Sequence, residues 1–325
     1  MSSWRAWATP LRKGILRLAM VQLLFPRDPF SVRDPDPAYV AEANAAESLG
    51  VTWHLVNFEA LTDEQDATKA VRQVQAQSEP VTWIYRGWML RPDRYAALYA
   101  ALLERGIQLI NDTPAYALTH LLPNWYPALT DSTPQSVWLD SADALDPAKL
   151  TAALAVFDGG PLIVKDYVKS QKHRWDEACF IPESGDLAAV ARVVHRFLEL
   201  QGPDLIGGVV FRRFETYEPL STHSRSGMPL TREYRLFLVD GEPISCTPYW
   251  EQGQYDDAVT VPLDLIRERV AAINSRFFTV DVARQVSGEW RIVELGDGQV
   301  AGLPERVDPL TFYRSVLRRL GSRPT

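Results

Sequence analysis

Two carboxylate residues lie opposite each other in a predicted β-hairpin near the end of the chain. Apolar runs flank Ser287-Gly288, a dipeptide typical of a two-residue turn, and a hairpin centred there pairs Asp281 with Glu294 on one face. The opposite face then carries the apolar side chains Val280, Val282, Val293 and Leu295. Facing carboxylates repel each other, so we expect a hard divalent cation with oxygen ligands to neutralise them. The alternative is a splayed or register-shifted hairpin with two solvated carboxylates.

A group of lysines follows an earlier strand pattern. Lys165 interrupts the apolar run PLIVKDYV, and a buried ammonium group is costly unless it has an anionic partner. Lys169 and Lys172 follow in a basic loop, with Ser170 between them. A strand lysine followed by a cationic, hydroxyl-bearing loop suits a polyphosphate, so we predict that all three lysines bind one. The alternative is an edge strand whose lysines prevent aggregation.

The segment GGVVFRRFETYEPLS leads from a further predicted strand into a loop. Such a segment can present backbone groups to an adenine ring, with Glu215 or Glu218 directed towards a ribose. The alternative is a plain connecting loop. The residues predicted to contact a nucleotide there are Arg213, Phe214, Glu215 and Glu218.

Two arginines in strand patterns are further candidates. Arg235 lies in the middle of REYRLFLV, on the same face as Glu233, where it would stabilise charge on a transferred phosphate or form a structural salt bridge. Arg86 follows the strand pattern VTWIY. Ligands of parallel sheets gather beyond the carboxyl ends of the strands, and arginine captures carboxylates with two hydrogen bonds, so we predict that Arg86 binds a substrate. The alternative is a structural arginine that caps the following turn.

The first part of the chain alternates strand and helix patterns. Strands are predicted at 15–24, 51–58, 81–87 and 107–112, with a helix from Asp36 to Gly50, another from Pro92 to Gly106 and a third from Thr113. This order indicates a mostly parallel sheet covered by helices. After a Pro-, Asp- and Ser-rich section from 123 to 147, strands joined by turns dominate, which indicates an antiparallel α+β region. The Asp240-Gly241 dipeptide predicts a hairpin turn in that region.

The composition is that of an ordinary globular protein. The chain has 325 residues, 46% of them hydrophobic and 23% charged, which suits two or three lobes. Its formal net charge of −7 gives no general attraction to nucleic acid or to an anionic membrane. Cys179 and Cys246 are the only cysteines, which argues against a disulfide framework and against a cysteine-rich zinc site. No apolar stretch reaches the roughly 20 residues of a membrane span, and we expect a cytoplasmic protein.

The order of these features resembles the ATP-grasp ligase superfamily. A strand lysine, a helix, an adenine-type loop, an arginine strand and a carboxylate hairpin follow one another along the chain. More closely, the chain is similar to an ATP-grasp clade named for a characteristic arginine and two lysines, and to its family 3. The resemblance spans nearly the whole chain and rests on the ordered set WIYRGWML, LINDTPAYALTHLLPNWY, IVKDYVKSQKHRW, REYRLFLVDGEP and VELGDGQVAGLP.

The resemblance implies a fold, cofactors and roles for several residues. Residues 1–122 would form a Rossmann-like α/β lobe that precedes the ATP-grasp region. Residues 123–325 would form an α+β ATP-grasp domain with antiparallel sheets, divided into 123–210 and 211–325. ATP and Mg²⁺ are the expected cofactors. The expected metal ligands are Asp281, Glu294 and Asp297, and the expected catalytic residues are Lys172 and Arg235.

The sequence departs from the family pattern at three places. His120 stands near the position of an early lysine, and KSQKHR replaces the usual Gly-rich phosphate loop. An asparagine commonly follows the second metal acid by two residues, but Gly296 stands there and Asp297 comes next.

As a whole, the resemblance implies an ATP- and Mg²⁺-dependent carboxylate–amine ligase that forms a peptide-type bond through an acyl phosphate. Its substrates would be small-molecule or peptide carboxylates and amines, and a homodimer is compatible with the sequence. The alternatives are an ATP-grasp phosphotransferase that phosphorylates a hydroxyl group, and a catalytically silent nucleotide-binding module. A dinucleotide oxidoreductase is disfavoured because no G-x-G-x-x-G motif follows the first strand.

Overall fold

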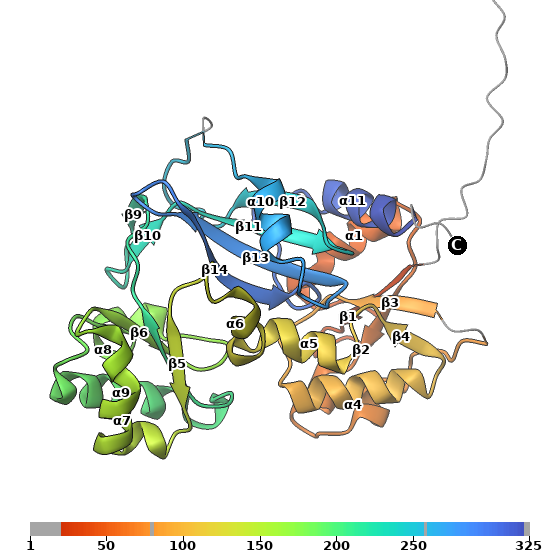
Figure 1. Cartoon of the computed structure of the whole chain (residues 1–325). Helices are drawn as coiled ribbons and strands as arrows, with labels where there is room; N and C mark the ends of the chain where they lie inside the picture. Colours follow the sequence, from red (N-terminus) through yellow and green to blue (C-terminus); the bar gives the residue numbers. More distant parts are fainter. Residues whose placement is uncertain (1–20, 79–80, 257–258, 322–325) are drawn as a thin grey trace, which may run out of the picture.

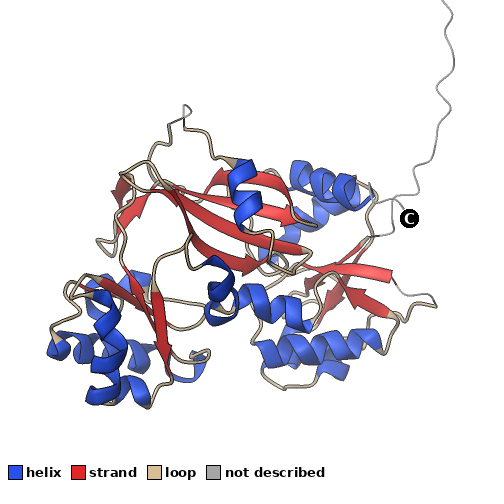
Figure 2. Cartoon of the chain, in the orientation of Figure 1, coloured by secondary structure: helices blue, strands red, loops and turns tan. Residues whose placement is uncertain are grey.

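The structure, a computed structural model, describes residues 21–78, 81–256 and 259–321. Three four-stranded sheets form its framework, together with a small two-stranded sheet (Figures 1 and 2). In Figure 1 the first sheet lies at the right, the second at the lower left and the third above them. The helices α5 (Thr113–His120) and α6 (Leu122–Leu129) run between the first two sheets.

The first sheet is fully parallel, in the order β2-β1-β3-β4. Its strands are β1 (Gln22–Pro26), β2 (Trp53–Val56), β3 (Val81–Tyr85) and β4 (Ile107–Leu109). Its helical segments are η1 (Pro37–Tyr39), α1 (Val40–Ser48), α2 (Phe58–Thr62), α3 (Ala67–Ala70) and α4 (Pro92–Leu103). The predicted α/β alternation is confirmed, although the start of its first strand, before residue 21, lies outside the described residues.

Both faces of this sheet are buried. Leu24, Trp83 and Tyr85 belong to one hydrophobic cluster with residues of α3 and α4. Leu23 and Ile84 point to the other face and belong to a cluster with residues of α1. Strands buried on both faces carry apolar residues at nearly every position, which is why the sequence shows these strands as apolar runs.

The second sheet is antiparallel, in the order β5-β8-β6-β7. Its strands are β5 (Ser136–Leu139), β6 (Leu162–Lys165), β7 (Phe180–Ile181) and β8 (Val209–Arg213). The helical segments around it are η2 (Asp143–Leu145), α7 (Pro147–Leu154), η3 (Ala155–Phe157), η4 (Lys172–Arg174), α8 (Trp175–Ala178), α9 (Leu187–Gln201) and η5 (Gly202–Asp204). Helix α9 is amphipathic and buries Val190, Val194 and Phe197, whereas the short α7 and α8 carry too few turns to give a clear periodic signal.

The third sheet is also antiparallel, in the order β12-β11-β13-β14. It consists of β11 (Glu233–Val239), β12 (Glu242–Pro248), β13 (Phe277–Arg284) and β14 (Trp290–Asp297), with α10 (Leu263–Arg269) and α11 (Pro309–Gly321). The small sheet pairs β9 (Pro219–Thr222) with β10 (Pro229–Thr231). Asp240 and Gly241 have φ values of +48° and +77°. Positive φ at both positions is the geometry of a type I′ hairpin turn, so the predicted turn is confirmed.

The β13–β14 hairpin differs from the prediction in two details. The Gln285 N–H donates to the Glu289 carbonyl at 2.7 Å, so the loop has three residues rather than two. A β-bulge then shifts the register between Asp281 and Val282, and Val282 pairs with Ile292 instead of Val293. The extra loop residue and the bulge cancel, so Asp281 still pairs with Glu294. The prediction that Val293 lies on the apolar face is wrong, because the bulge turns it towards a cavity.

The first and third sheets share one hydrophobic core. Phe25 of β1 lies in a cluster with Phe237 of β11 and Phe277 of β13, and with Phe312 and Tyr313 of α11. Helix α11 also packs against α1. The core therefore crosses residue 122, where the sequence suggests a domain boundary, and our division into 1–122 and 123–325 remains a proposal.

Candidate active site

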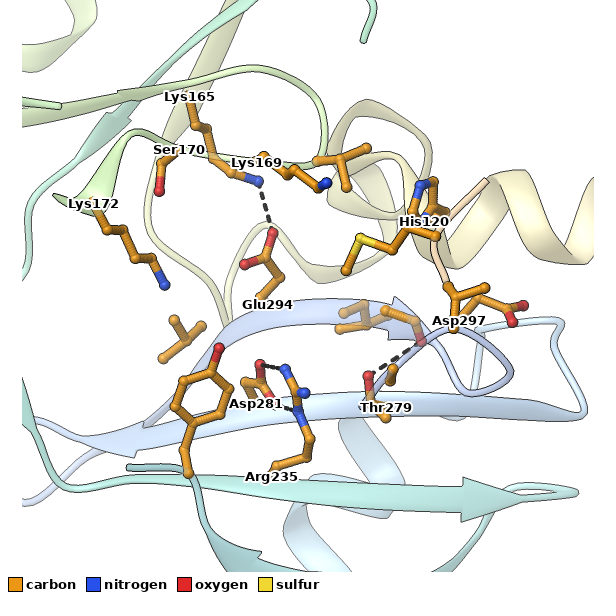
Figure 3. A pocket seen from close by; sticks show the side chains of 18 of the residues that line it. His120, Lys165, Lys169, Ser170, Lys172, Arg235, Thr279, Asp281, Glu294 and Asp297 are labelled. Carbon is orange, nitrogen blue, oxygen red and sulfur yellow. Dashed lines mark hydrogen bonds and ion pairs between the residues drawn. The ribbon is translucent and has the colours of Figure 1, made fainter. Parts of the chain in front are cut away.

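A cavity of about 340 Å³ lies where the second and third sheets meet the end of α5 (Figure 3). Its walls come from β6 and the loop that follows it, from β8, and from β11, β13 and β14. The polar side chains that line it are His120, Lys165, Lys169, Ser170, Lys172, Arg212, Arg235, Tyr249, Thr279, Asp281, Glu294 and Asp297. The cavity thus collects most of the predicted site residues in one place.

The two hairpin carboxylates each pair with a cation from a different strand. Lys165 Nζ lies 2.7 Å from Glu294 Oε1. Arg235 donates from Nε to Asp281 Oδ1 at 2.8 Å and from Nη2 to Oδ2 at 2.7 Å, a bidentate contact. Burial acts to raise the pKa of Glu294, but Lys165 and Lys172 lower it below its ordinary value. The expected repulsion is therefore neutralised by the protein's own cations, and the carboxylate pair does not by itself require a metal ion.

Lys172 differs from Lys165 because no carboxylate of the described residues lies within ion-pair distance of it. Its ammonium lies 5.9 Å from the ring centre of Tyr249 and 5.6 Å from that of Trp250. Burial acts to lower the pKa of Lys172, but Tyr249 and the nearby acidic groups together raise it by more than burial lowers it. Its pKa therefore lies above the ordinary value. Lys172 is therefore a cation available to an anionic ligand. Lys169 is exposed at the rim of the same cavity.

Arg212 lines the cavity, although the sequence analysis selected its neighbour Arg213. Arg212 is buried and donates from Nη2 to Thr133 Oγ1 and to the Val293 carbonyl, each at 2.7 Å. Neighbouring residues of a strand point to opposite faces. In the β6–β8 pairing, Ile163 lies opposite Arg212, which puts Arg212 on the face that also carries Lys165. Strand alternation combined with this pairing would have identified Arg212.

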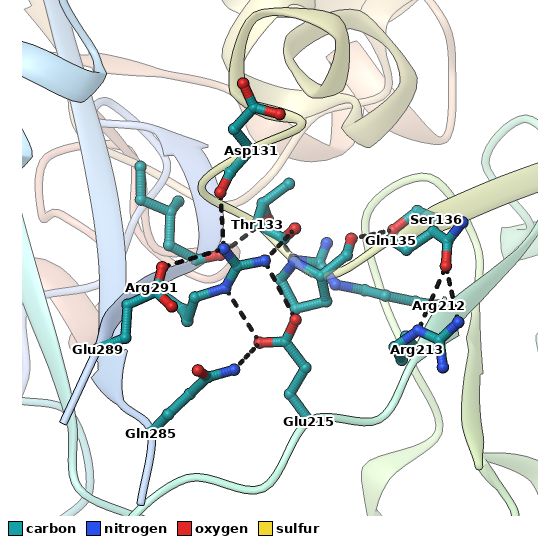
Figure 4. A network of polar contacts seen from close by, with 12 residues as sticks. Asp131, Thr133, Gln135, Ser136, Arg212, Arg213, Glu215, Gln285, Glu289 and Arg291 are labelled. Carbon is teal, nitrogen blue, oxygen red and sulfur yellow. Dashed lines mark hydrogen bonds and ion pairs between the residues drawn. The ribbon is translucent and has the colours of Figure 1, made fainter. Parts of the chain in front are cut away.

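The four residues predicted to contact a nucleotide lie outside the cavity lining. Arg213 donates from Nη2 to Gln135 Oε1 at 2.9 Å, and Phe214 packs edge-on against the rings of Trp175 and Phe180 (the arginine is shown in Figure 4).

Glu215 and Glu218 are ion-paired within the protein. Glu215 Oε1 is 3.1 Å from Arg291 Nη2, at the centre of the network in Figure 4, and Glu218 pairs with Arg284. Both acids have cationic partners and lie outside the cavity lining, and their expected ribose role stays a prediction.

Asp297 lines the cavity but is a poor candidate for a third metal ligand. It is fully buried, and its Oδ2 accepts from Asn111 Nδ2 at 2.6 Å while its Oδ1 accepts from the Gln299 N–H at 2.9 Å. Burial raises its pKa to about 7, although the donors from Asn111 and Gln299 favour the charged form. Asp297 therefore ties the end of β14 to the first lobe.

Arg86 is buried and lies outside the lining of this cavity. It is 1% exposed and forms a bidentate ion pair with Glu42, through Nε to Oε2 at 2.9 Å and Nη2 to Oε1 at 3.1 Å. Its Nη1 donates to the carbonyls of Gly298 at 2.5 Å and Ala301 at 2.9 Å. Four of the five N–H donors of the guanidinium group are therefore used within the protein, and its expected substrate role stays a prediction. Arg86 instead joins the first lobe to the segment after β14.

His120 lies at the cavity wall, near the position where the family pattern has a lysine. Its ring stacks on Tyr116 with 4.8 Å between ring centres, and its buried Nε2 has no hydrogen-bond partner among the described residues. Burial lowers the pKa of His120 to about 4, and the nearby Lys165 and Lys169 lower it in the same direction. The imidazole is therefore neutral at physiological pH.

The carboxylate pair fits one class of metal site. Among the described residues, no three or more His, Cys, Asp or Glu side chains are grouped so that they could hold a metal ion. Mg²⁺ in nucleotide sites is usually held by one or two carboxylates, with substrate phosphates and water as the other ligands. Asp281 and Glu294 supply oxygen donors of this kind at the cavity wall.

No described helix is long and apolar enough to cross a membrane.

Comparisons with solved structures identify the fold. The ATP-grasp ligase PsnB, complexed with a minimal precursor, Mg and ADP, matches with a TM-score of 0.54 at 15% identity, over 94% of this chain and 99% of PsnB. The D-cycloserine synthetase DcsG matches with a TM-score of 0.56 at 15% identity, over 92% and 99% of the two chains. D-alanyl-alanine synthetase A from Vibrio cholerae matches with a TM-score of 0.55 at 13% identity, over 93% and 96%. At these identities the likeness is one of fold.

A family model supplies the assignment. No curated protein matches the chain. The model of the ATP-grasp domain of family 3 in the arginine-and-two-lysine clade matches residues 156–316, which contain Lys165, Lys172, Arg235 and the carboxylate hairpin. The resemblance seen in the sequence is thereby confirmed. Residues 156–316 form an ATP-grasp domain of family 3 in the clade named for one arginine and two lysines.

Proposed function

We propose that the protein is an ATP- and Mg²⁺-dependent carboxylate–amine ligase that activates its acid substrate as an acyl phosphate. The observation that carries this proposal is the pairing of the hairpin carboxylates with Lys165 and Arg235 at the wall of one cavity. The fold supports it, since ATP-grasp ligases of similar structure were solved with Mg and ADP, or with AMPPNP.

The site binds the nucleotide by exchange of ionic partners. Lys165 leaves Glu294 and binds a phosphate of ATP, while Lys172 and the exposed Lys169 close on the phosphates from the following loop. Asp281 and Glu294 hold Mg²⁺, which when bound neutralises charge on the phosphates. The four residues of the two ion pairs, Lys165, Glu294, Arg235 and Asp281, therefore each have a counter-charge both before and after ATP binds.

The remaining residues position the reacting groups. A carboxylate oxygen of the acid attacks the γ-phosphorus, and the bond from that phosphorus to ADP breaks. Arg235, released from Asp281, and Lys172 stabilise the negative charge on the transferred group. The amine nitrogen then attacks the acyl carbon, phosphate leaves, and a proton is released from nitrogen. Arg212 and the neutral His120 complete the polar lining of the cavity.

The two carboxylates provide the first test. Asp281→Asn and Glu294→Gln should each abolish Mg²⁺-dependent phosphate release from ATP in the presence of a panel of amino acids and dipeptides. Glu289→Gln is the matched control, because Glu289 is an exposed acid next to the same hairpin loop and should leave the rate unchanged. Wild-type rates in both site variants would contradict the proposal.

The same assay separates the alternatives. A ligase needs an amine for sustained product formation, whereas a phosphotransferase forms ADP at the same rate without one. A silent nucleotide-binding module would bind ATP without forming ADP under any of these conditions.

A further inference from the structure

A second cavity of about 400 Å³ adjoins the first. Arg235 and Tyr249 line both cavities, so the two share a wall. A third, smaller cavity of about 170 Å³ shares His223 and Trp250 with the second cavity and Lys172 with the first. We call the second and third cavities together the side groove. It reaches the first cavity at Lys172 and Arg235 and leads away from the nucleotide site.

Segments that have no part in the proposed nucleotide chemistry build the outer part of this groove. They are the turn between β9 and β10, the stretch after β12, and residues 302–304 after β14. Glu251 and Gln252 are exposed, so the groove is open to solvent at its outer end. Trp250 lies between its two cavities, and its buried indole Nε1 has no hydrogen-bond partner among the described residues.

The inner end of the side groove carries two cations, Lys172 and Arg235, of which Arg235 is paired with the Asp281 carboxylate. Lys172 has no carboxylate of the described residues at ion-pair distance, and Arg235 lies with its guanidinium carbon 4.7 Å from the ring centre of Tyr249. Cations on the faces of Tyr249 and Trp250 already occupy the positions in which these rings would attract an ammonium group. The inner end therefore favours an anionic group of a ligand over a cationic one.

We propose that the side groove binds the acid substrate as part of a peptide. The reacting carboxylate lies between Lys172 and Arg235, and the neighbouring peptide residues lie along Trp250 and His223. The inference rests on the proposed function, which assigns the first cavity to the nucleotide and leaves the side groove to the other substrate. Sites for small molecules bury about 70–90% of the ligand surface. The side groove, by contrast, is closed only at the end where the reacting carboxylate lies, and it is open to solvent at Gln252.

Carboxylate activation can be measured without knowledge of the natural amine. Hydroxylamine attacks an acyl phosphate at the acyl carbon, displaces phosphate and gives a hydroxamate, and this product is quantified by mass spectrometry. The probes are randomised pentapeptides with blocked ends and a central Glu or Asp, a randomised pentapeptide library with a free C-terminus, and free glutamate, aspartate and alanine. At equal carboxylate concentration with Mg²⁺ and ATP, we expect at least tenfold more hydroxamate from one of the libraries than from any free amino acid.

Two variants locate this preference in the side groove. Gln252→Trp should block the open end and reduce the peptide reaction at least tenfold, and Trp250→Ala should reduce it by removing the main contact surface. Gln252→Trp should leave the dissociation constant for Mg²⁺-ATP unchanged. Gln75→Trp is the matched control, because Gln75 is exposed in the first lobe and outside every cavity named here.

The outcomes separate this inference from the proposed function. Free amino acids that react as well as the libraries would overturn the peptide assignment, as would an unchanged library reaction in Gln252→Trp. If calorimetry shows Mg²⁺-ATP binding but no acid of any kind gives hydroxamate, the peptide assignment is also wrong. Failure of Mg²⁺-ATP to bind would overturn the proposed function itself.

Discussion

The acidic residues of the site are held by cations that a ligand can replace. The Lys165 side chain is 5% exposed and its partner Glu294 is 31% exposed, so the pair is shielded on one side and accessible on the other. Removing one member of a buried ion pair leaves an uncompensated charge, which is strongly destabilising. A ligand that brings phosphates for Lys165 and a cation for Glu294 avoids this cost, and Mg²⁺-ATP does both.

This exchange makes Lys165 the residue on which nucleotide affinity depends most. Lys165→Met keeps the length and the apolar stem but deletes the charge, so the dissociation constant for Mg²⁺-ATP should rise at least tenfold, equivalent to about 1.4 kcal/mol. Isothermal titration calorimetry measures this change. Lys149→Met serves as the control, because Lys149 pairs with Asp143 at the surface and lies outside the cavity lining. Unchanged affinity in Lys165→Met would show that the nucleotide binds elsewhere.

Individual residues were predictable from the sequence where local geometry decides their position. Strand periodicity predicts that Asp281 and Glu294 face each other. The cost of a buried charge predicts that Lys165 has an anionic partner. The roles of Arg86 and Asp297 depend on partners that are distant in sequence, Glu42 and Asn111. No spacing rule within one strand identifies such partners.

At the scale of elements, the hairpin shows how two local errors leave a correct result. The loop has one more residue than predicted, and the bulge at Val293 compensates for it. Gly288 has a φ of +95°, which an L side chain rarely adopts, and this left-handed residue is typical of a three-residue hairpin loop. The bulge also directs the Val293 carbonyl to Arg212. Bulges follow from contacts across the sheet, which periodicity does not contain.

The buried ion pair between Arg86 and Glu42 connects three elements. The Tyr313 hydroxyl of α11 also donates to Glu42 Oε2, at 2.6 Å. Arg86→Met should lower the free energy of unfolding by about 3–5 kcal/mol, because Glu42 stays buried without its cation. The double variant Arg86→Met/Glu42→Gln should be more stable than the single variant, since it buries no charge. Urea unfolding measures both.

The surface pair of Arg196 with Glu199 gives the control for this prediction, and Arg196→Met should leave the midpoint of urea unfolding nearly unchanged. If Arg86→Met instead kept wild-type stability and raised the apparent KM for the acid substrate, Arg86 would belong to the substrate site after all.

The buried Asp297 should make stability depend on pH. Its folded-state pKa of about 7 lies above the ordinary value of 3.8. The folded protein therefore binds a proton more tightly than the unfolded chain, and this contribution to stability falls as pH rises from about 4 to about 7. Arg86 and the phenols of Tyr95 and Tyr116 are the other titratable groups that act on this region.

Asp297→Asn removes this titration. The measured quantity is the free energy of unfolding of the variant minus that of the wild type, both without nucleotide. This difference should increase from pH 5 to pH 8, because at pH 8 only the wild type must bury a charged carboxylate. Denaturant unfolding at both pH values measures the difference, and the other titrating groups cancel in the subtraction. A pH-independent difference would show that Asp297 is already ionised in the folded state at pH 5.

At the scale of the whole molecule, the site exists because the second and third sheets meet the end of α5. The sequence predicts the parallel first sheet, the antiparallel later sheets and their order along the chain. It does not predict that the first and third sheets share a core through Phe25, Phe237 and Phe277, or that the side groove opens beside Arg235. Both features depend on how complete lobes pack, and this packing is a sum of many small contacts rather than a local pattern.

The most direct measurement is a crystal structure of the protein with Mg²⁺ and a non-hydrolysable ATP analogue. We predict that Mg²⁺ binds oxygens of Asp281 and Glu294 at about 2.0–2.1 Å, and that Lys165 Nζ contacts a phosphate instead of Glu294. A nucleotide bound outside this cavity, with the Lys165–Glu294 and Arg235–Asp281 pairs intact, would contradict the proposed site and the ligase chemistry assigned to it.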